Sequence, residues 1–78
     1  MNEFQVRLYG AEDAVKLVNA ANGCDFDVDV IRGSVIHDAK SLLGVLSLAQ
    51  RQPVTVRLHG TNAELESLLA SYRIRETA

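Results

Sequence analysis

The stretch HDAKSLLGVLSL, residues 37–48, is the part of the sequence that indicates the fold most strongly. It begins with polar residues, reaches Ser41, and then becomes almost wholly apolar. Serine is favoured at the N-cap of a helix, because its hydroxyl accepts a hydrogen bond from a backbone N–H of the first turn. The apolar residues that follow are too many for one buried stripe on so short a helix: Leu42, Leu43, Val45, Leu46 and Leu48. We therefore predict a short helix whose apolar outer face is available for contact.

Alternation of apolar and polar residues on both sides of this helix predicts four strands. The alternating stretches are residues 3–9, 25–30, 35–37 and 54–59. The second and third strands are separated by Arg32-Gly33-Ser34, a sequence that is typical of a turn. These two strands are therefore predicted to form a hairpin.

Apolar residues at helical spacing predict two further helices. The first covers about residues 11–21 and ends at Asn22-Gly23, where glycine can take the left-handed conformation. The second begins at Thr61, which forms a predicted capping box with Glu64. Its expected buried face consists of Leu65, Leu68, Leu69 and Tyr72. Residues 73–78 are expected to fray.

The order of these elements is β-α-β-β-α-β-α. Its short connections and its hairpin favour an α+β fold, an open-faced β-sandwich in which a four-stranded antiparallel sheet carries the helices on one face. We expect a single domain over residues 1–78, since a chain of this length is near the lower limit for one hydrophobic core.

Composition narrows the classes of function. The net charge is −2 and the eight Lys and Arg residues are scattered, which is not the pattern of a nucleic-acid surface. The single cysteine, Cys24, excludes an internal disulfide and a cysteine-based zinc cluster. No apolar run approaches the ~20 residues of a membrane span, and no signal peptide follows Met1. We expect a cytoplasmic protein without a cofactor or metal that contacts other proteins, not nucleic acid or membrane.

Residues 40–48, Lys40-Ser41-Leu42-Leu43-Gly44-Val45-Leu46-Ser47-Leu48, resemble the regulatory-serine segment of HPr, the phosphocarrier of the bacterial sugar phosphotransferase system. The likeness extends upstream through Asp25 and downstream through Val54–Gly60. It implies an HPr-like fold. It also implies that Ser41 is the serine that an HPr kinase/phosphorylase modifies in many Gram-positive bacteria, and that Lys40 would offset part of the added charge.

In HPr the matching helix forms the docking surface for enzymes and regulators. Carried over to this chain, the resemblance implies a partner-binding set of Lys40, Leu42, Leu43, Leu46 and Ser47. With Ser41 as the cap, Val45 and Leu48 are predicted to turn toward the sheet. The implied partners are the kinase/phosphorylase and either a transcription regulator or a phosphotransferase-system enzyme.

The resemblance fails where HPr carries its phosphate, in a Gly-Leu/Ile-His-Ala-Arg-Pro-Ala loop before the first helix. The corresponding residues 8–14 contain no histidine, arginine or proline. Glu12 and Asp13 place carboxylates at the helix end where a phosphoryl group would rest, and like charges oppose its binding. We therefore expect a non-catalytic regulatory or interaction protein that is switched by phosphorylation at Ser41.

Alternatives remain open. The chain could be a phosphocarrier that uses a non-standard histidine, His37 or His59, although both are more simply explained as exposed polar residues at strand ends. Chains of β-α-β-β-α-β order also include small-ligand-binding regulatory domains. In a further alternative, Ser41 is a helix cap without a regulatory role. The leucines of the same helix then serve packing or self-association and not the binding of a partner. The expected state is a monomer or a weak dimer.

Overall fold

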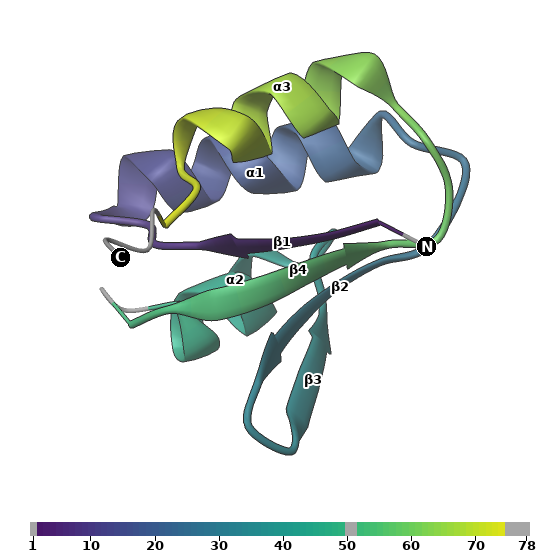
Figure 1. Cartoon of the computed structure of the whole chain (residues 1–78). Helices are drawn as coiled ribbons and strands as arrows, with labels where there is room; N and C mark the ends of the chain where they lie inside the picture. The colour runs from purple at the N-terminus through teal and green to yellow at the C-terminus, as the bar shows by residue number, and fades with distance from the viewer. Residues whose placement is uncertain (1, 50–51, 75–78) are drawn as a thin grey trace.

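A computed structural model describes residues 2–49 and 52–74. The elements are β1 (Asn2–Val6), α1 (Ala11–Asn22), β2 (Val28–Arg32), β3 (Val35–Asp38), α2 (Leu42–Leu48), β4 (Val54–Leu58) and α3 (Ala63–Ser71). The predicted order, β-α-β-β-α-β-α, is confirmed. Figure 1 shows α1 and α3 side by side over the sheet, and the β2–β3 hairpin projecting away from them.

The four strands form one antiparallel sheet with the order β1-β4-β2-β3. One row across it joins Phe4, Val56, Val30 and His37, so these side chains share the face that the helices cover. Alternate residues point to the opposite, open face. The predicted α+β open-faced β-sandwich is therefore confirmed.

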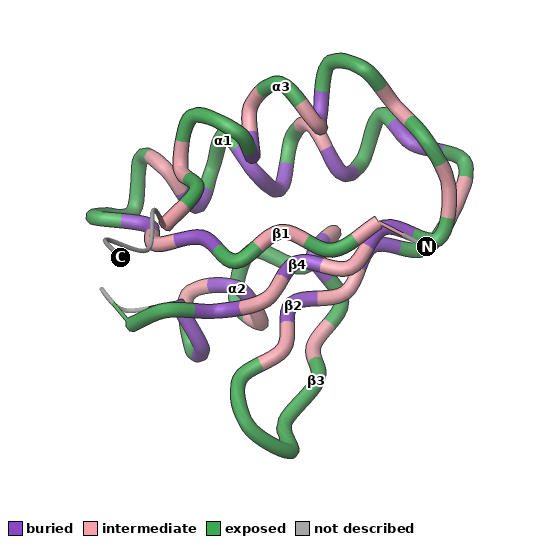
Figure 2. The backbone as a smooth tube through the Cα atoms, viewed as in Figure 1, coloured by how far each residue is buried: buried purple, intermediate pink, exposed green. Residues whose placement is uncertain are grey.

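The core lies between the sheet and the helices, and all of its fully buried side chains are apolar. Strand residues Val6, Val30 and Val56 are completely buried, which the alternation in the sequence predicts. Helix α2 packs against α1, β2 and β3 and contributes Val45 and Leu48 to the same cluster. Figure 2 shows the buried positions on the inner sides of the strands and helices, whereas the tip of the hairpin is exposed.

Two strands differ from their predicted bounds by more than one residue. β1 ends at Val6, although the buried Leu8 continues the alternation for two more residues. β2 begins at Val28 instead of Asp25. Phe26 precedes it in a bend and packs so closely on Gly60 that a methyl group there would overlap the ring.

The predicted helix boundaries need two corrections. Gly23 is not left-handed but has φ −77° and ψ −5°. The helix ends in a tightened turn, in which Gly23 N–H donates to Ala20 O, so no left-handed residue is needed. The N-cap of α3 is Asn62, not Thr61. Asn62 Oδ1 accepts from Leu65 N at 2.9 Å, and Glu66, not Glu64, accepts from the Asn62 N–H.

The beginning of the segment expected to fray is ordered. Ile74 N donates to Gln5 O at 2.9 Å, Arg7 N donates to Tyr72 O at 3.1 Å, and Arg73 forms a bridge with Val6. These backbone bonds cover the outer edge of β1. Residues 75–78 of the predicted frayed tail lie outside the described residues.

Candidate functional site

Ser41 caps α2 as the sequence predicts. Its backbone is extended, and its Oγ accepts a hydrogen bond from Gly44 N at 3.2 Å. Its carbonyl accepts the first helical bond, from Val45 N at 3.0 Å. Ser41 is exposed, so an enzyme can reach the hydroxyl while the backbone around it is fixed.

The outer face of α2, which we define as Leu42, Leu43, Leu46 and Ser47, is graded in exposure. Leu43 is 79% exposed and Leu42 is 39% exposed. Ser47 is exposed, while Leu46 is half-buried against the core. On the opposite side, Val45 and Leu48 are buried as predicted. The helix therefore presents two leucines to solvent, with Leu46 at the margin.

Gly44 lets α2 approach β3 closely. A Cβ at this position would lie 3.2 Å from His37 Cβ and 3.5 Å from Ser41 Oγ. His37 is therefore a half-buried residue under α2, and its description as an exposed strand-end residue is wrong. The prediction was wrong because His37 lies on the side of β3 that the helices cover, where it pairs with Val30.

Lys40 is hydrogen-bonded to residues at the end of α1 and just after it. Its Nζ donates to Cys24 O at 3.1 Å, and its carbonyl accepts from Asn22 Nδ2 at 3.1 Å. These two bonds tie the start of α2 to the end of α1. The ammonium group is therefore hydrogen-bonded at the junction of α1 and α2, and its offsetting of a phosphate charge at Ser41 stays a prediction.

The buried Cys24 lies at this junction, 6% exposed. Burial raises the pKa of the Cys24 thiol, and the nearby Lys40 offsets part of this rise. The thiol donates weakly to Ala20 O. It is therefore a packing residue and not a reactive nucleophile.

Asp13 occupies the N-terminus of α1. Its Oδ2 accepts from Tyr9 N at 3.0 Å, and its Oδ1 accepts from the Tyr72 hydroxyl at 3.3 Å. Burial, followed by the Asp13 carboxylate, raises the pKa of the Tyr72 phenol. The N-cap itself, Gly10, has no side chain to bond the first turn. The Asp13 carboxylate therefore lies at the positive N-terminal end of α1, where a negative charge is favourable.

Two arginines that the sequence analysis did not single out lie near this helix end. Arg7, just after β1, and Arg73, after α3, line the same surface depression of about 350 Å³ as Asp13. Arg7 Nε is buried and has no hydrogen-bond partner among residues 2–49 and 52–74. Arg7 and Arg73 are far apart in sequence, so no local motif predicts that they lie close together. The backbone pairing of residues 72–74 along β1 brings them to the same place.

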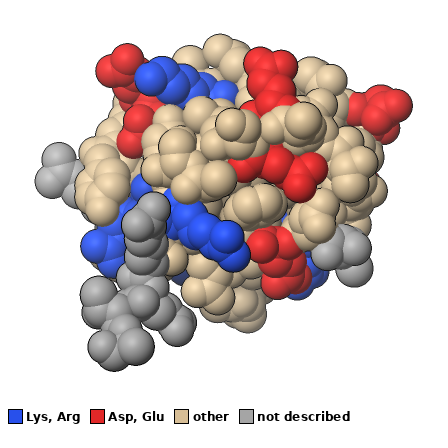
Figure 3. Space-filling model, turned by 45° about the horizontal axis from the view of Figure 1, so that its top comes forward, with Lys and Arg blue, Asp and Glu red and all other residues tan. Residues whose placement is uncertain are grey.

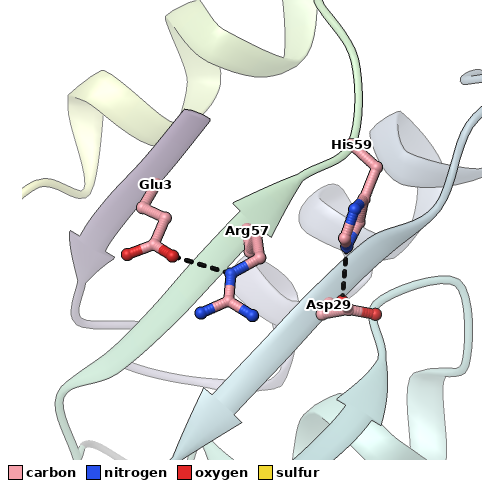
Figure 4. A network of polar contacts seen from close by, with 4 residues as sticks. All are labelled: Glu3, Asp29, Arg57 and His59. Carbon is pink, nitrogen blue, oxygen red and sulfur yellow. Dashed lines mark hydrogen bonds and ion pairs between the residues drawn. The ribbon is translucent and has the colours of Figure 1, made fainter. Parts of the chain in front are cut away.

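The open face of the sheet carries one ion pair and one hydrogen bond between a histidine and a carboxylate (Figure 4). Arg57 Nε donates to Glu3 Oε2 at 2.7 Å, and His59 Nε2 lies 2.7 Å from Asp29 Oδ2. His59 is exposed, as predicted. Among the described residues, no group of three or more His, Cys, Asp or Glu side chains could hold a metal ion.

Charge on the face of the molecule that Figure 3 shows is mixed. In Figure 3 the Lys and Arg side chains form separate small groups, with Asp and Glu between them. Within the described part of the chain, no helix combines the length and the apolar character that crossing a membrane requires.

Comparisons with known proteins agree with this geometry. The family model described as "PTS HPr component phosphorylation site" matches residues 10–71. The chain therefore belongs to the HPr family of the phosphotransferase system, which confirms the resemblance seen in the sequence.

Among solved structures, the chain is similar to the phosphocarrier protein HPr of Bacillus anthracis str. Ames. The two are 30% identical, with a TM-score of 0.70, and the match covers 92% of this chain and 94% of that one. HPr-C-His from Thermoanaerobacter tengcongensis is 23% identical, with a TM-score of 0.72 over 91% of this chain and 89% of that one. A mycoplasma histidine-containing phosphocarrier protein shares the fold at 15% identity, with a TM-score of 0.68 over 90% and 93%. Curated protein sequences give no match.

Proposed function

We propose that this HPr-family protein is non-catalytic and works by docking other proteins on the outer face of α2. The observation that carries the proposal is Leu43, which is 79% exposed on a helix whose other side is firmly buried. An exposed leucine has no role in the core, and beside Leu42 it forms an apolar contact point. Ser47, which belongs to this face, and Lys40, which precedes the Ser41 cap, are the polar members of the proposed surface.

We propose in addition that Ser41 is the phosphorylation site of an HPr kinase/phosphorylase. A phosphate there would meet the positive end of α2, so the helix would tolerate it. It would also add up to two negative charges next to Leu42 and Leu43. A partner that binds the apolar face would therefore distinguish the two forms by charge.

Transfer of phosphate by the family's route is not part of the proposed function. The loop at the start of α1 has no histidine. Asp13 already accepts the Tyr9 N–H and the Tyr72 hydroxyl there. A phosphoryl group near this carboxylate would be repelled and would have to compete for both donors.

The modification is tested by incubating the protein with an HPr kinase/phosphorylase and ATP and measuring the intact mass. One phosphate is expected on the wild type and on Ser47→Ala, which removes the other exposed hydroxyl of α2. None is expected on Ser41→Ala. An unmodified wild type, or a phosphate mapped to another residue, would remove the Ser41 part of the proposal.

The docking surface is tested by capturing a partner from the native lysate with the wild-type protein and then titrating the captured partner against the wild type and Leu43→Glu. Val15→Glu is a matched control, since Val15 is 40% exposed on a different helix. Binding should be lost with Leu43→Glu and kept with Val15→Glu. The expected partners are the kinase/phosphorylase and a transcription regulator or phosphotransferase-system enzyme. Equal binding by both variants would refute the assignment of the surface to α2.

A second candidate function has one specific observation in its favour. Because His59 Nε2 is bonded to the Asp29 carboxylate, its Nδ1 is left as the nitrogen that could accept a phosphoryl group. This supports the non-standard phosphocarrier alternative at His59. Acid-labile phosphate that forms with phosphoenolpyruvate and the first enzyme of the system, and that disappears in His59→Ala, would establish it.

A further inference from the structure

His37 lies beneath the start of α2, on the side of β3 that the helices cover. It pairs with Val30 of β2 and is half-buried. Gly44 lies directly over it, since a Cβ on Gly44 would be 3.2 Å from His37 Cβ and 3.5 Å from His37 Cγ. The row of the sheet that holds His37 otherwise consists of Phe4, Val56 and Val30. An apolar residue would serve packing alone at this position.

The Ser41 hydroxyl is close to the same point. The Cβ position on Gly44 is also 3.5 Å from Ser41 Oγ. Since Ser41 Oγ and His37 Cγ lie at the same distance from one point, they are separated by at most twice that distance. Gly44 places no side chain between the hydroxyl and the ring, whereas any other residue would add a Cβ in contact with both.

A phosphate on Ser41 can span this separation. Phosphate oxygens extend about 2.5 Å beyond Oγ, the ring nitrogens of histidine lie about 1.4–2.2 Å beyond Cγ, and a charge-assisted hydrogen bond spans about 2.8 Å. These lengths together reach about 7 Å, which matches the largest separation that the two 3.5 Å distances allow. A direct hydrogen bond between the phosphate and His37 is therefore within reach.

The imidazole of His37 has no anionic partner within residues 2–49 and 52–74. It forms no hydrogen bond there, whereas His59 Nε2 lies 2.7 Å from Asp29 Oδ2. Helix α2, which packs on β3, contains no charged side chain. From β2 the residue opposite His37 is the apolar Val30. A phosphate on Ser41 would therefore bring a negative charge to a ring that otherwise lacks one.

The charged groups nearest to His37 in the chain and in the sheet have other contacts. Arg32, on the same face of β2, donates through Nη1 to Leu48 O at 3.1 Å. Asp38 points to the open face, and its Oδ1 accepts from Lys40 N at 2.9 Å. Lys40 Nζ donates to Cys24 O at 3.1 Å. His37 thus differs from these groups in having its ring available to a phosphate.

We infer that His37 is the counter-ion of a phosphate on Ser41, and that a hydrogen bond from the protonated imidazole to a phosphate oxygen holds the phosphate over Gly44. This inference rests on the proposed modification of Ser41 and adds the residue that positions the modified side chain. The contact is strongest at about pH 6–7, where an imidazole can be protonated while a phosphate carries its second charge, and it weakens at higher pH. Holding the phosphate in one place lowers the entropy cost of its recognition by a partner.

Phosphorus NMR of the full chain, with phosphoserine incorporated at position 41 during synthesis, tests the inference. A cation within hydrogen-bond reach stabilises the doubly charged phosphate, so the second ionisation of the phosphoserine moves to lower pH. Its midpoint should lie about 0.5–1 pH unit lower in the chain with His37 than in His37→Gln, which keeps a polar side chain without the charge. His59→Gln is the matched control, because it removes the other histidine and should leave the midpoint unchanged.

A second readout uses the chain without any substitution and does not depend on the fold of a variant. The ring nitrogen signals of His37 should shift when Ser41 carries a phosphate, while those of His59 should not. Equal midpoints with and without His37→Gln would overturn the inference, and so would unchanged His37 ring signals or an equal effect of His59→Gln. Because the phosphate is introduced by synthesis, failure of an HPr kinase/phosphorylase to modify Ser41 would count against the proposed function and not against this contact.

Discussion

Truncating the two leucines Leu43 and Leu48 of α2 separates the helix's surface role from its packing role. Fully burying a leucine contributes about 1.5–3 kcal/mol. Leu43 is 79% exposed, so its burial contributes only about a fifth of this free energy. Leu43→Ala should therefore lower the free energy of unfolding by about 0.3–0.6 kcal/mol. Leu48 is 5% exposed, and Leu48→Ala should cost about 2–5 kcal/mol, because it also leaves a cavity.

Urea denaturation followed by circular dichroism measures both values. A domain of 78 residues has a total stability of roughly 4–12 kcal/mol, so Leu48→Ala removes a large share of it. With a slope near about 1 kcal/mol per molar urea, the midpoint should fall by about 2 M or more for Leu48→Ala and by less than about 0.6 M for Leu43→Ala.

A Leu43→Ala cost equal to that of Leu48→Ala, measured at a protein concentration where the chain is monomeric, would refute this reasoning. It would mean that Leu43 packs against the protein's own core. The proposed docking surface would then lose the residue on which it rests.

Three further predictions concern single contacts. Ser41→Ala should lower the free energy of unfolding by about 0.5–2 kcal/mol through loss of the α2 cap, whereas Ser41→Asp should restore most of it in the same urea experiment. Gly60→Ala should cost about 1–3 kcal/mol, because the added methyl overlaps the Phe26 ring; an unchanged thermal midpoint would contradict this. Burial and the Asp13 carboxylate raise the pKa of Tyr72, so the wild type should lose stability as the pH rises from about 10 to the raised value, while below about pH 10 this group has no effect. Tyr72→Phe should lack this loss, which thermal melts over alkaline pH would detect.

The sequence predicted the elements whose pattern is local and strong. Alternation in Val54–Leu58 gave β4 and its buried face, because a strand buried on one side must repeat every two residues. In α2, Ser41 fixed where the helix begins, and this placed Val45 on the inner side and Leu43 on the outer side. The cap and the exposure of Leu43 were therefore predictable from one residue.

What the sequence could not predict depends on contacts between distant segments. Arg7 and Arg73 line the same depression because residues 72–74 pair along β1. His37 is covered because Gly44 allows α2 to lie close to β3. The direction of Lys40 is set by the carbonyl of Cys24, which belongs to another loop. None of these pairs has a spacing that a local motif describes.

The docking claim is tested most directly by titrating an HPr kinase/phosphorylase into the isotope-labelled protein and following the backbone amides by NMR. The proposal predicts that signals of Ser41 to Ser47 shift or broaden first, that Leu43→Glu abolishes the effect, and that the amides of β1 and β4 stay unchanged. Perturbation centred on Asp13 at the start of α1, with α2 unaffected, would contradict it.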